Sequence, residues 1–100
     1  RKRFVASVNF REFFIKKINF NHISFIKLDT EGYDMKLIQN IWPSVELRRP
    51  CFMIEWFVNT EKSIVNFLKT FNYHSADFNT GREYRLLPPE WMADLILIPN

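Results

Sequence analysis

Four ionisable side chains gather after a short apolar run and form the densest group of chemically active residues in the sequence. Lys27, Asp29, Glu31 and Asp34 lie within the stretch Lys-Leu-Asp-Thr-Glu-Gly-Tyr-Asp. Carboxylates in such a group can orient a cationic or hydroxyl-bearing ligand, accept a proton as a general base, or bind a divalent ion. Negative charge is also favourable in the first turn of a helix, so Glu31 and Asp34 have a second interpretation as helix-capping residues.

A further carboxylate, Glu55, ends another apolar run. We expect it at the same sheet edge as the first group, with a role either in catalysis or in a salt bridge with Lys27 or an arginine. His22 and His74 stand alone and show no metal-ligand spacing with Cys51, so the sequence predicts no metal site.

Apolar runs and helical periodicities alternate along the chain, and this alternation predicts an α/β fold. The apolar runs predict strands at residues 4–8, 23–28, 51–54, 73–78 and 95–98. Apolar residues at spacings of three and four predict helices at residues 10–18, 34–42 and 61–71. We expect Pro43 to end the second helix, Thr60 to cap the third, and Asn72 to follow it in a left-handed conformation.

The strand–helix–strand order places the acidic residues at the carboxyl edge of a parallel sheet. Open α/β sheets bind their ligands at this edge, so we expect function there.

Composition limits the classes of protein to consider. The 100 residues are 47% hydrophobic and 17% aromatic, which suits one globular domain or part of a larger one. Gly32 and Gly81 are the only glycines, so a Gly-x-Gly-x-x-Gly nucleotide turn and a Gly-x-x-x-x-Gly-Lys phosphate loop are excluded. A single cysteine excludes an intramolecular disulfide and favours a cytoplasmic location. We expect neither a membrane span nor a signal peptide.

Charge is unevenly distributed along the chain. Residues 1–27 carry seven Lys or Arg against one Glu, whereas residues 28–100 carry seven against ten acids. A basic segment can contact nucleic acid, although a frayed terminus at residues 1–3 and the solvated face of a helix at Lys16 and Lys17 explain the charge more simply. A non-enzymatic α/β module that contacts nucleic acid is therefore the alternative to an enzyme. A metal-dependent hydrolase using Asp29, Glu31 and Asp34 is a further alternative.

Several stretches resemble FkbM-type methyltransferases, which use S-adenosylmethionine. The resemblance covers about residues 5–99 and rests on residues 23–34, 52–55, 68–73 and 95–99. Its most specific part is the Lys-x-Asp-x-Glu-Gly-x-acid signature. Asp34 stands where relatives usually have Glu, and Asn72 stands where they typically have Gly.

The resemblance implies the C-terminal half of a Rossmann-like methyltransferase sheet, mostly parallel, with helices on both faces and an antiparallel last strand between two others. Residues 1–100 would then form one partial domain without the cofactor-binding N-terminal half. The isolated chain is expected to be inactive, to bind S-adenosylmethionine weakly or not at all, and to self-associate through an exposed sheet edge.

The resemblance also implies roles for individual residues. It places Asp29 and Glu31 in catalysis, Lys27 and Asp29 near the cofactor, and Asp34 and Glu55 near the substrate. The implied reaction is O-methylation of a small molecule or a sugar hydroxyl. From the residues themselves we expect no metal and no membrane partner, and nucleic acid only in the alternative function. A carboxylate beside the acceptor would orient it or remove its proton as the methyl group is attacked.

Overall fold

The computed structural model describes residues 4–8, 23–30, 32–89 and 94–100. Within them the elements are β1 (Phe4–Val8), β2 (Ile23–Leu28), α2 (Asp34–Val45), β3 (Cys51–Glu55), the 3₁₀ turn η1 (Val58–Thr60), α3 (Glu61–Phe71), β4 (Tyr73–Asp77), β5 (Glu83–Tyr84) and β6 (Asp94–Pro99). The strands and the second and third helices expected from the sequence are confirmed, with small shifts at their ends. The helix expected at residues 10–18 lies outside the described residues.

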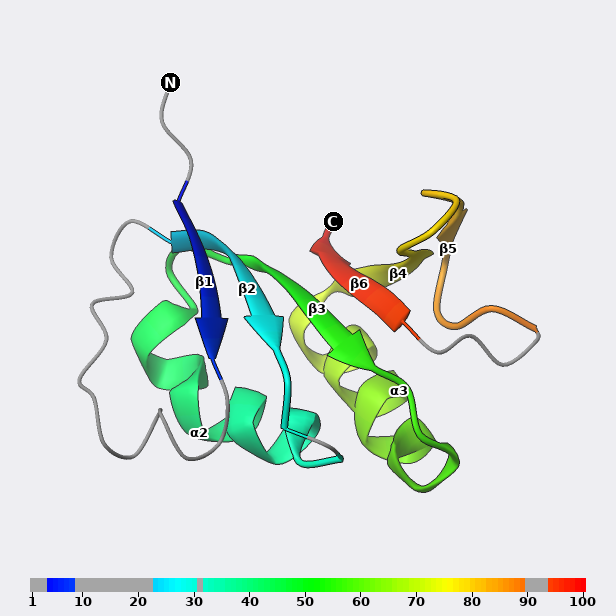
Figure 1. The fold of residues 1–100 in the computed structure, drawn as a ribbon, viewed down its shortest axis with the longest axis horizontal. Helices are drawn as coiled ribbons and strands as arrows, with labels where there is room; N and C mark the ends of the chain where they lie inside the picture. Colours follow the sequence, from blue (N-terminus) through cyan, green and yellow to red (C-terminus); the bar gives the residue numbers. More distant parts are fainter. Residues whose placement is uncertain (1–3, 9–22, 31, 90–93) are drawn as a thin grey trace.

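The strands form one mixed sheet in the order β1-β2-β3-β6-β4-β5 (Figure 1). β1, β2 and β3 pair in parallel, and β6 runs antiparallel between β3 and β4, as expected for the last strand. Four of the six strands, β1 to β4, run in the same direction, but the sheet is mixed, because three of its five pairings are antiparallel. Two of these come from inserting β6 between strands of the opposite direction, and the third comes from the short hairpin partner β5.

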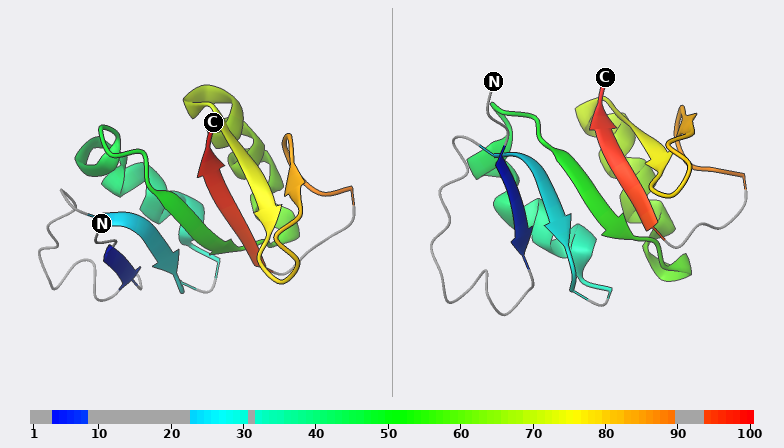
Figure 2. Two further views of the ribbon diagram at one scale, coloured as in Figure 1. Left: turned by 90° about the horizontal axis from the view of Figure 1, so that it is seen from above. Right: turned by 45° about the horizontal axis from the view of Figure 1, so that its top comes forward.

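Both α2 and α3 pack against the same face of the sheet (Figure 2). Side chains on this face are buried, as the alternation along β3 and β6 shows: Phe52, Ile54, Leu95 and Leu97 are at most 1% exposed. Their neighbours along the strands are only partly buried. In the described part of the chain, the expected arrangement with helices on both faces is therefore not found.

An aromatic cluster joins the two helices to the sheet. Trp42 from α2, Phe67 and Phe71 from α3, and Phe52 and Tyr73 from the strands have ring centroids 4.5–6.4 Å apart. Tilted and edge-on aromatic pairs at these distances add to the stabilisation from buried apolar area. The cluster holds the C-terminal parts of α2 and α3 against each other and against the sheet.

The expectation that Pro43 ends the second helix is wrong, because α2 continues to Val45. Proline lacks the N–H that would bond to the carbonyl oxygen of Gln39. Both residues are exposed, so water can satisfy that carbonyl. The extension past Pro43 buries Val45 to 1% exposure, next to Trp42 at 8%, and this apolar burial offsets the lost bond.

The third helix begins and ends where the sequence predicts. Asn72 follows it with φ of 59°, the left-handed conformation that asparagine tolerates. Thr60 occupies the N-cap position, but its hydroxyl donates to the carbonyl oxygen of Phe57 instead of capping the helix. None of the helices in the described ranges is long and apolar enough to cross a bilayer.

Candidate functional site

A small hollow lies where β2 and β3 end and β6 begins. We call it the strand-end pocket; its volume is about 210 Å³, and it is lined by Lys27, Leu28, Asp29, Met53, Ile54, Glu55 and Asp94. Lys27 of β2 is in register with Met53 of β3, so Asp29 and Glu55 each follow that pair by two residues. The parallel register therefore brings together three of the predicted site residues, Lys27, Asp29 and Glu55.

The fourth ionisable residue of the pocket, Asp94, was not predicted. β6 runs antiparallel, so its first residue lies at the edge where the parallel strands end, and Asp94 pairs with Glu55. In the sequence, Asp94 stands just before the last apolar run. Whether that position lies at the pocket or at the other edge of the sheet depends on the direction of the strand, which the acid itself does not indicate.

The strand-end pocket is predominantly acidic. Met53 and Glu55 alternate along β3 with the buried Phe52 and Ile54, so their side chains lie on the sheet face opposite α2 and α3. Lys27 and Asp29 are exposed, whereas Glu55 and Asp94 are partly buried. Its carboxylates accept hydrogen bonds and attract positive charge, while Lys27 supplies one donor group. The arrangement can hold a hydroxyl-bearing or cationic group, and a carboxylate can take a proton from it.

Asp34 does not line this pocket. Its side chain is 3% exposed, and its carboxylate connects the loop after β2 to the end of β3. Oδ1 accepts hydrogen bonds from the backbone N–H of Thr30 at 3.2 Å and from the Thr30 hydroxyl. Oδ2 accepts one from the backbone N–H of Glu55 at 2.9 Å. Asp34 is thus placed to hold two walls of the pocket together.

The loop between β2 and α2 contains the remaining signature residues. Gly32 has φ of 103°, a conformation that side chains disfavour even though a Cβ there would meet no atom within 4 Å. Glu31, predicted to be catalytic, lies outside the described residues.

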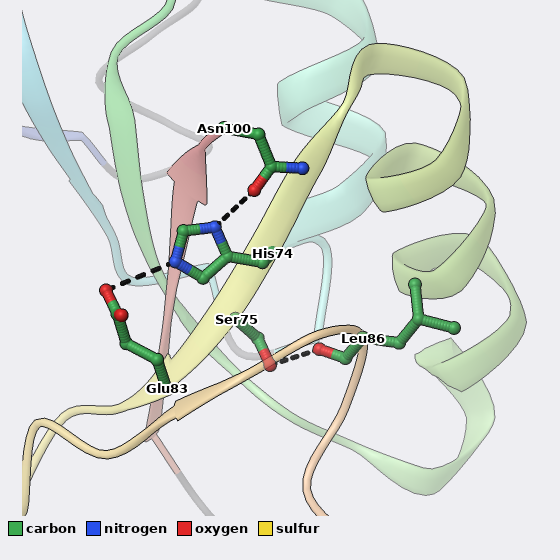
Figure 3. A network of polar contacts seen from close by, with 5 residues as sticks. All are labelled: His74, Ser75, Glu83, Leu86 and Asn100. Atoms are coloured by element: carbon green, nitrogen blue, oxygen red, sulfur yellow. Dashed lines mark hydrogen bonds and ion pairs between the residues drawn. The ribbon is translucent and has the colours of Figure 1, made fainter.

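A separate polar network lies on β4, beyond β6 in the sheet order (Figure 3). The ring of His74 bonds through Nδ1 to Oδ1 of Asn100 at 2.5 Å and through Nε2 to Glu83 at 3.2 Å. On the same strand, the hydroxyl of Ser75 donates to the carbonyl oxygen of Leu86. These contacts attach β5, the segment after it and the C-terminal residue to β4, a structural role for His74.

Two features bear on the alternative functions: the basic residues before residue 28 for nucleic-acid binding, and the acidic residues for a metal-dependent hydrolase. Of the seven basic residues before residue 28, all except Lys27 lie outside the described residues. Within the described ranges, no group of three or more His, Cys, Asp or Glu side chains is placed to hold a metal ion.

The chain matches no protein-family model, no curated protein and no solved structure. Inferences about its function therefore rest on the residues themselves.

Proposed function

We propose that this chain is the C-terminal part of an S-adenosylmethionine-dependent methyltransferase of the FkbM type. The strand-end pocket is the part of the reaction site that this chain supplies. The observation that carries the proposal is the meeting of Lys27, Asp29 and Glu55 at the ends of two neighbouring parallel strands. The antiparallel last strand, inserted between β3 and β4, supports the same proposal, because the resemblance implies that placement.

The residues of the strand-end pocket fit one part of the cofactor. S-adenosylmethionine supplies a methyl group from a positively charged sulfur when it is bound, and it also carries an amino group. Carboxylates such as Asp29 stabilise nearby positive charge. A volume of about 210 Å³ is below the range of about 300–1,000 Å³ typical of small-molecule sites. The chain therefore contacts part of the cofactor, and residues of an N-terminal half make the other contacts.

The chain's own residues orient the acceptor and handle its proton. Asp29, with Glu31 as the second candidate, accepts a hydrogen bond from the acceptor hydroxyl and takes its proton as methyl transfer proceeds. Glu55 contacts the acceptor from the neighbouring strand. Asp34 holds the loop to β3 through its bonds to Thr30 and Glu55 and so acts as a positioning residue.

The proposal also accounts for the outer edge of the sheet. β1 is the terminal strand of the described sheet, so further strands of the domain would pair there. Left unpaired, this edge favours self-association of the isolated chain.

A titration of the ¹⁵N-labelled chain with S-adenosylmethionine, followed by NMR, tests the proposal. We expect weak binding that shifts the amide signals of residues 27–29 and 53–55 and leaves those of β4 and β5 unchanged. Asp29→Asn should weaken the response, whereas Glu61→Gln, an exposed acid on α3, should not. The absence of shifts at the strand-end pocket at millimolar concentration would refute the proposed contact, and micromolar affinity would refute the partial-domain interpretation.

A further inference from the structure

A second and larger hollow lies on the opposite face of the sheet, between the first turns of α2 and α3. We call it the interhelix pocket; its volume is about 460 Å³, and its described lining is Gly32, Tyr33, Met35, Lys36, Gln39, Asn59, Thr60 and Ser63. This volume lies within the range of small-molecule binding sites. The interhelix pocket is more than twice as large as the strand-end pocket.

The two pockets share an edge of the sheet. Gly32 and Tyr33 belong to the loop that begins with Asp29, and Asn59 and Thr60 follow β3 shortly after Glu55. The N-terminal ends of α2 and α3 lie at the same end of the molecule as the tips of β2 and β3 (Figure 1). A ligand in the interhelix pocket therefore lies beside the loop that carries the proposed catalytic carboxylate.

The chemistry of the lining points to a particular class of ligand. The Tyr33 ring is 52% exposed and offers a flat apolar surface with a polar tip. The exposed amides of Gln39 and Asn59 and the hydroxyl of Ser63 each provide donor and acceptor atoms. A pyranose ring has matching chemistry, since its C–H groups form a flat face and its hydroxyls project from the rim.

The charge of the lining narrows the class further. Lys36 is the only charged residue in the described lining, and its Nζ lies 6.0 Å from the centroid of the Tyr33 ring. One ligand can therefore contact the ring and the ammonium group together. The strand-end pocket, by contrast, is lined by Asp29, Glu55 and Asp94 and disfavours an anion.

We propose that the interhelix pocket binds a hexose that carries one negatively charged substituent, a carboxylate or a phosphate. This binding does not rest on the proposed function. The Tyr33 ring stacks on the sugar face, Lys36 pairs with the anionic substituent, and the amides and the Ser63 hydroxyl bond to the ring hydroxyls.

The test is an NMR titration of the 100-residue chain without any methyl donor, using glucuronate, glucose 6-phosphate, glucose and inorganic phosphate. We expect glucuronate and glucose 6-phosphate to shift the signals of Tyr33, Lys36, Gln39, Asn59 and Ser63. Glucose should bind severalfold more weakly, because it lacks the charge. A response to phosphate equal to that of glucose 6-phosphate would overturn the proposal by showing an anion site without sugar recognition, and so would no response to either anionic sugar.

Matched variants distinguish the contact of the Tyr33 ring with the sugar face from the contact of Lys36 with the anionic substituent. Tyr33→Ala should weaken glucuronate binding about tenfold by removing the stacking surface, whereas Phe78→Ala, which removes another exposed ring, should not. Lys36→Met should weaken glucuronate binding but not glucose binding, whereas Lys69→Met should change neither. All four positions are exposed, so the variants should fold. Equal effects of a variant and its control would overturn the assignment.

The outcomes for the two pockets are distinguishable. Sugar binding without any response to S-adenosylmethionine would support the sugar site and count against the proposed cofactor contact at the strand-end pocket. A response to S-adenosylmethionine without sugar binding would count against the sugar site alone.

Discussion

Replacing Asp34 by asparagine tests whether this residue holds the loop to the sheet or contacts the substrate. The side chain is 3% exposed and accepts hydrogen bonds from the Thr30 amide, the Thr30 hydroxyl and the Glu55 amide. Asparagine keeps the shape but offers one oxygen, so its NH₂ group must face at least one of these donors. The variant therefore loses a charged acceptor and leaves a donor unsatisfied.

The expected loss follows from these contacts. A hydrogen bond to a charged group contributes about 1.5–3 kcal/mol, and an unsatisfied buried donor costs about 1–3 kcal/mol. Because one substitution causes both effects on the same group, we expect the free energy of unfolding to fall by about 2–4 kcal/mol. With a urea m-value of about 1–1.5 kcal/mol/M for a chain of this size, the midpoint should fall by about 1.3–4 M.

Urea denaturation followed by tryptophan fluorescence measures this effect, since Trp42 and Trp56 are buried. Asp29→Asn is the matched control: Asp29 is exposed on the same loop, and its replacement should change stability by less than about 0.5 kcal/mol. An unchanged midpoint for Asp34→Asn, together with loss of ligand binding, would refute the positioning role and favour the substrate contact predicted from the sequence.

Three further predictions concern the contacts that join α3 to its surroundings. Burial raises the pKa of the Tyr73 hydroxyl, so the unfolded chain releases this proton at a lower pH than the folded chain does. The free energy of unfolding should therefore fall as the pH rises above about 10. Urea denaturation on both sides of that pH should show this fall, and Tyr73→Phe should abolish it. Arg49 donates to the carbonyl oxygens of Phe71 and Asn72, both at 2.9 Å. Because lysine lacks the planar guanidinium group that makes both bonds, Arg49→Lys should lower the free energy of unfolding by about 1–2 kcal/mol. An unchanged urea midpoint would contradict this. Asn72→Gly should keep the thermal midpoint close to that of the parent, whereas Asn72→Ala should cost about 1 kcal/mol because alanine disfavours φ of 59°; equal midpoints for the two variants would argue against this.

Much of the fold could be predicted because each segment carries its own pattern. The spacing of apolar residues predicted α3 and its left-handed end at Asn72, and the apolar runs predicted β2 and β3. A helix between two such strands implies that they pair in parallel, and parallel strands end at one edge. The meeting of Lys27, Asp29 and Glu55 was predictable for that reason.

Other features depend on partners that are distant in the sequence. Asp34 is buried because its carboxylate meets the Glu55 amide across the gap between β2 and β3, and no local pattern distinguishes this from an exposed helix start. Asp94 joins the strand-end pocket through the antiparallel direction of β6. The helix continues past Pro43 because Val45 is then buried in the core.

The sequence by itself determined the elements and the acidic edge of the sheet, because periodicity and residue type act within a segment. The tertiary structure alone decided which face the described helices cover, which carboxylate is enclosed, and that Tyr33 and Asn59 share one pocket. These features arise from the packing of α2 and α3 against each other and the sheet, and packing depends on pairs of segments.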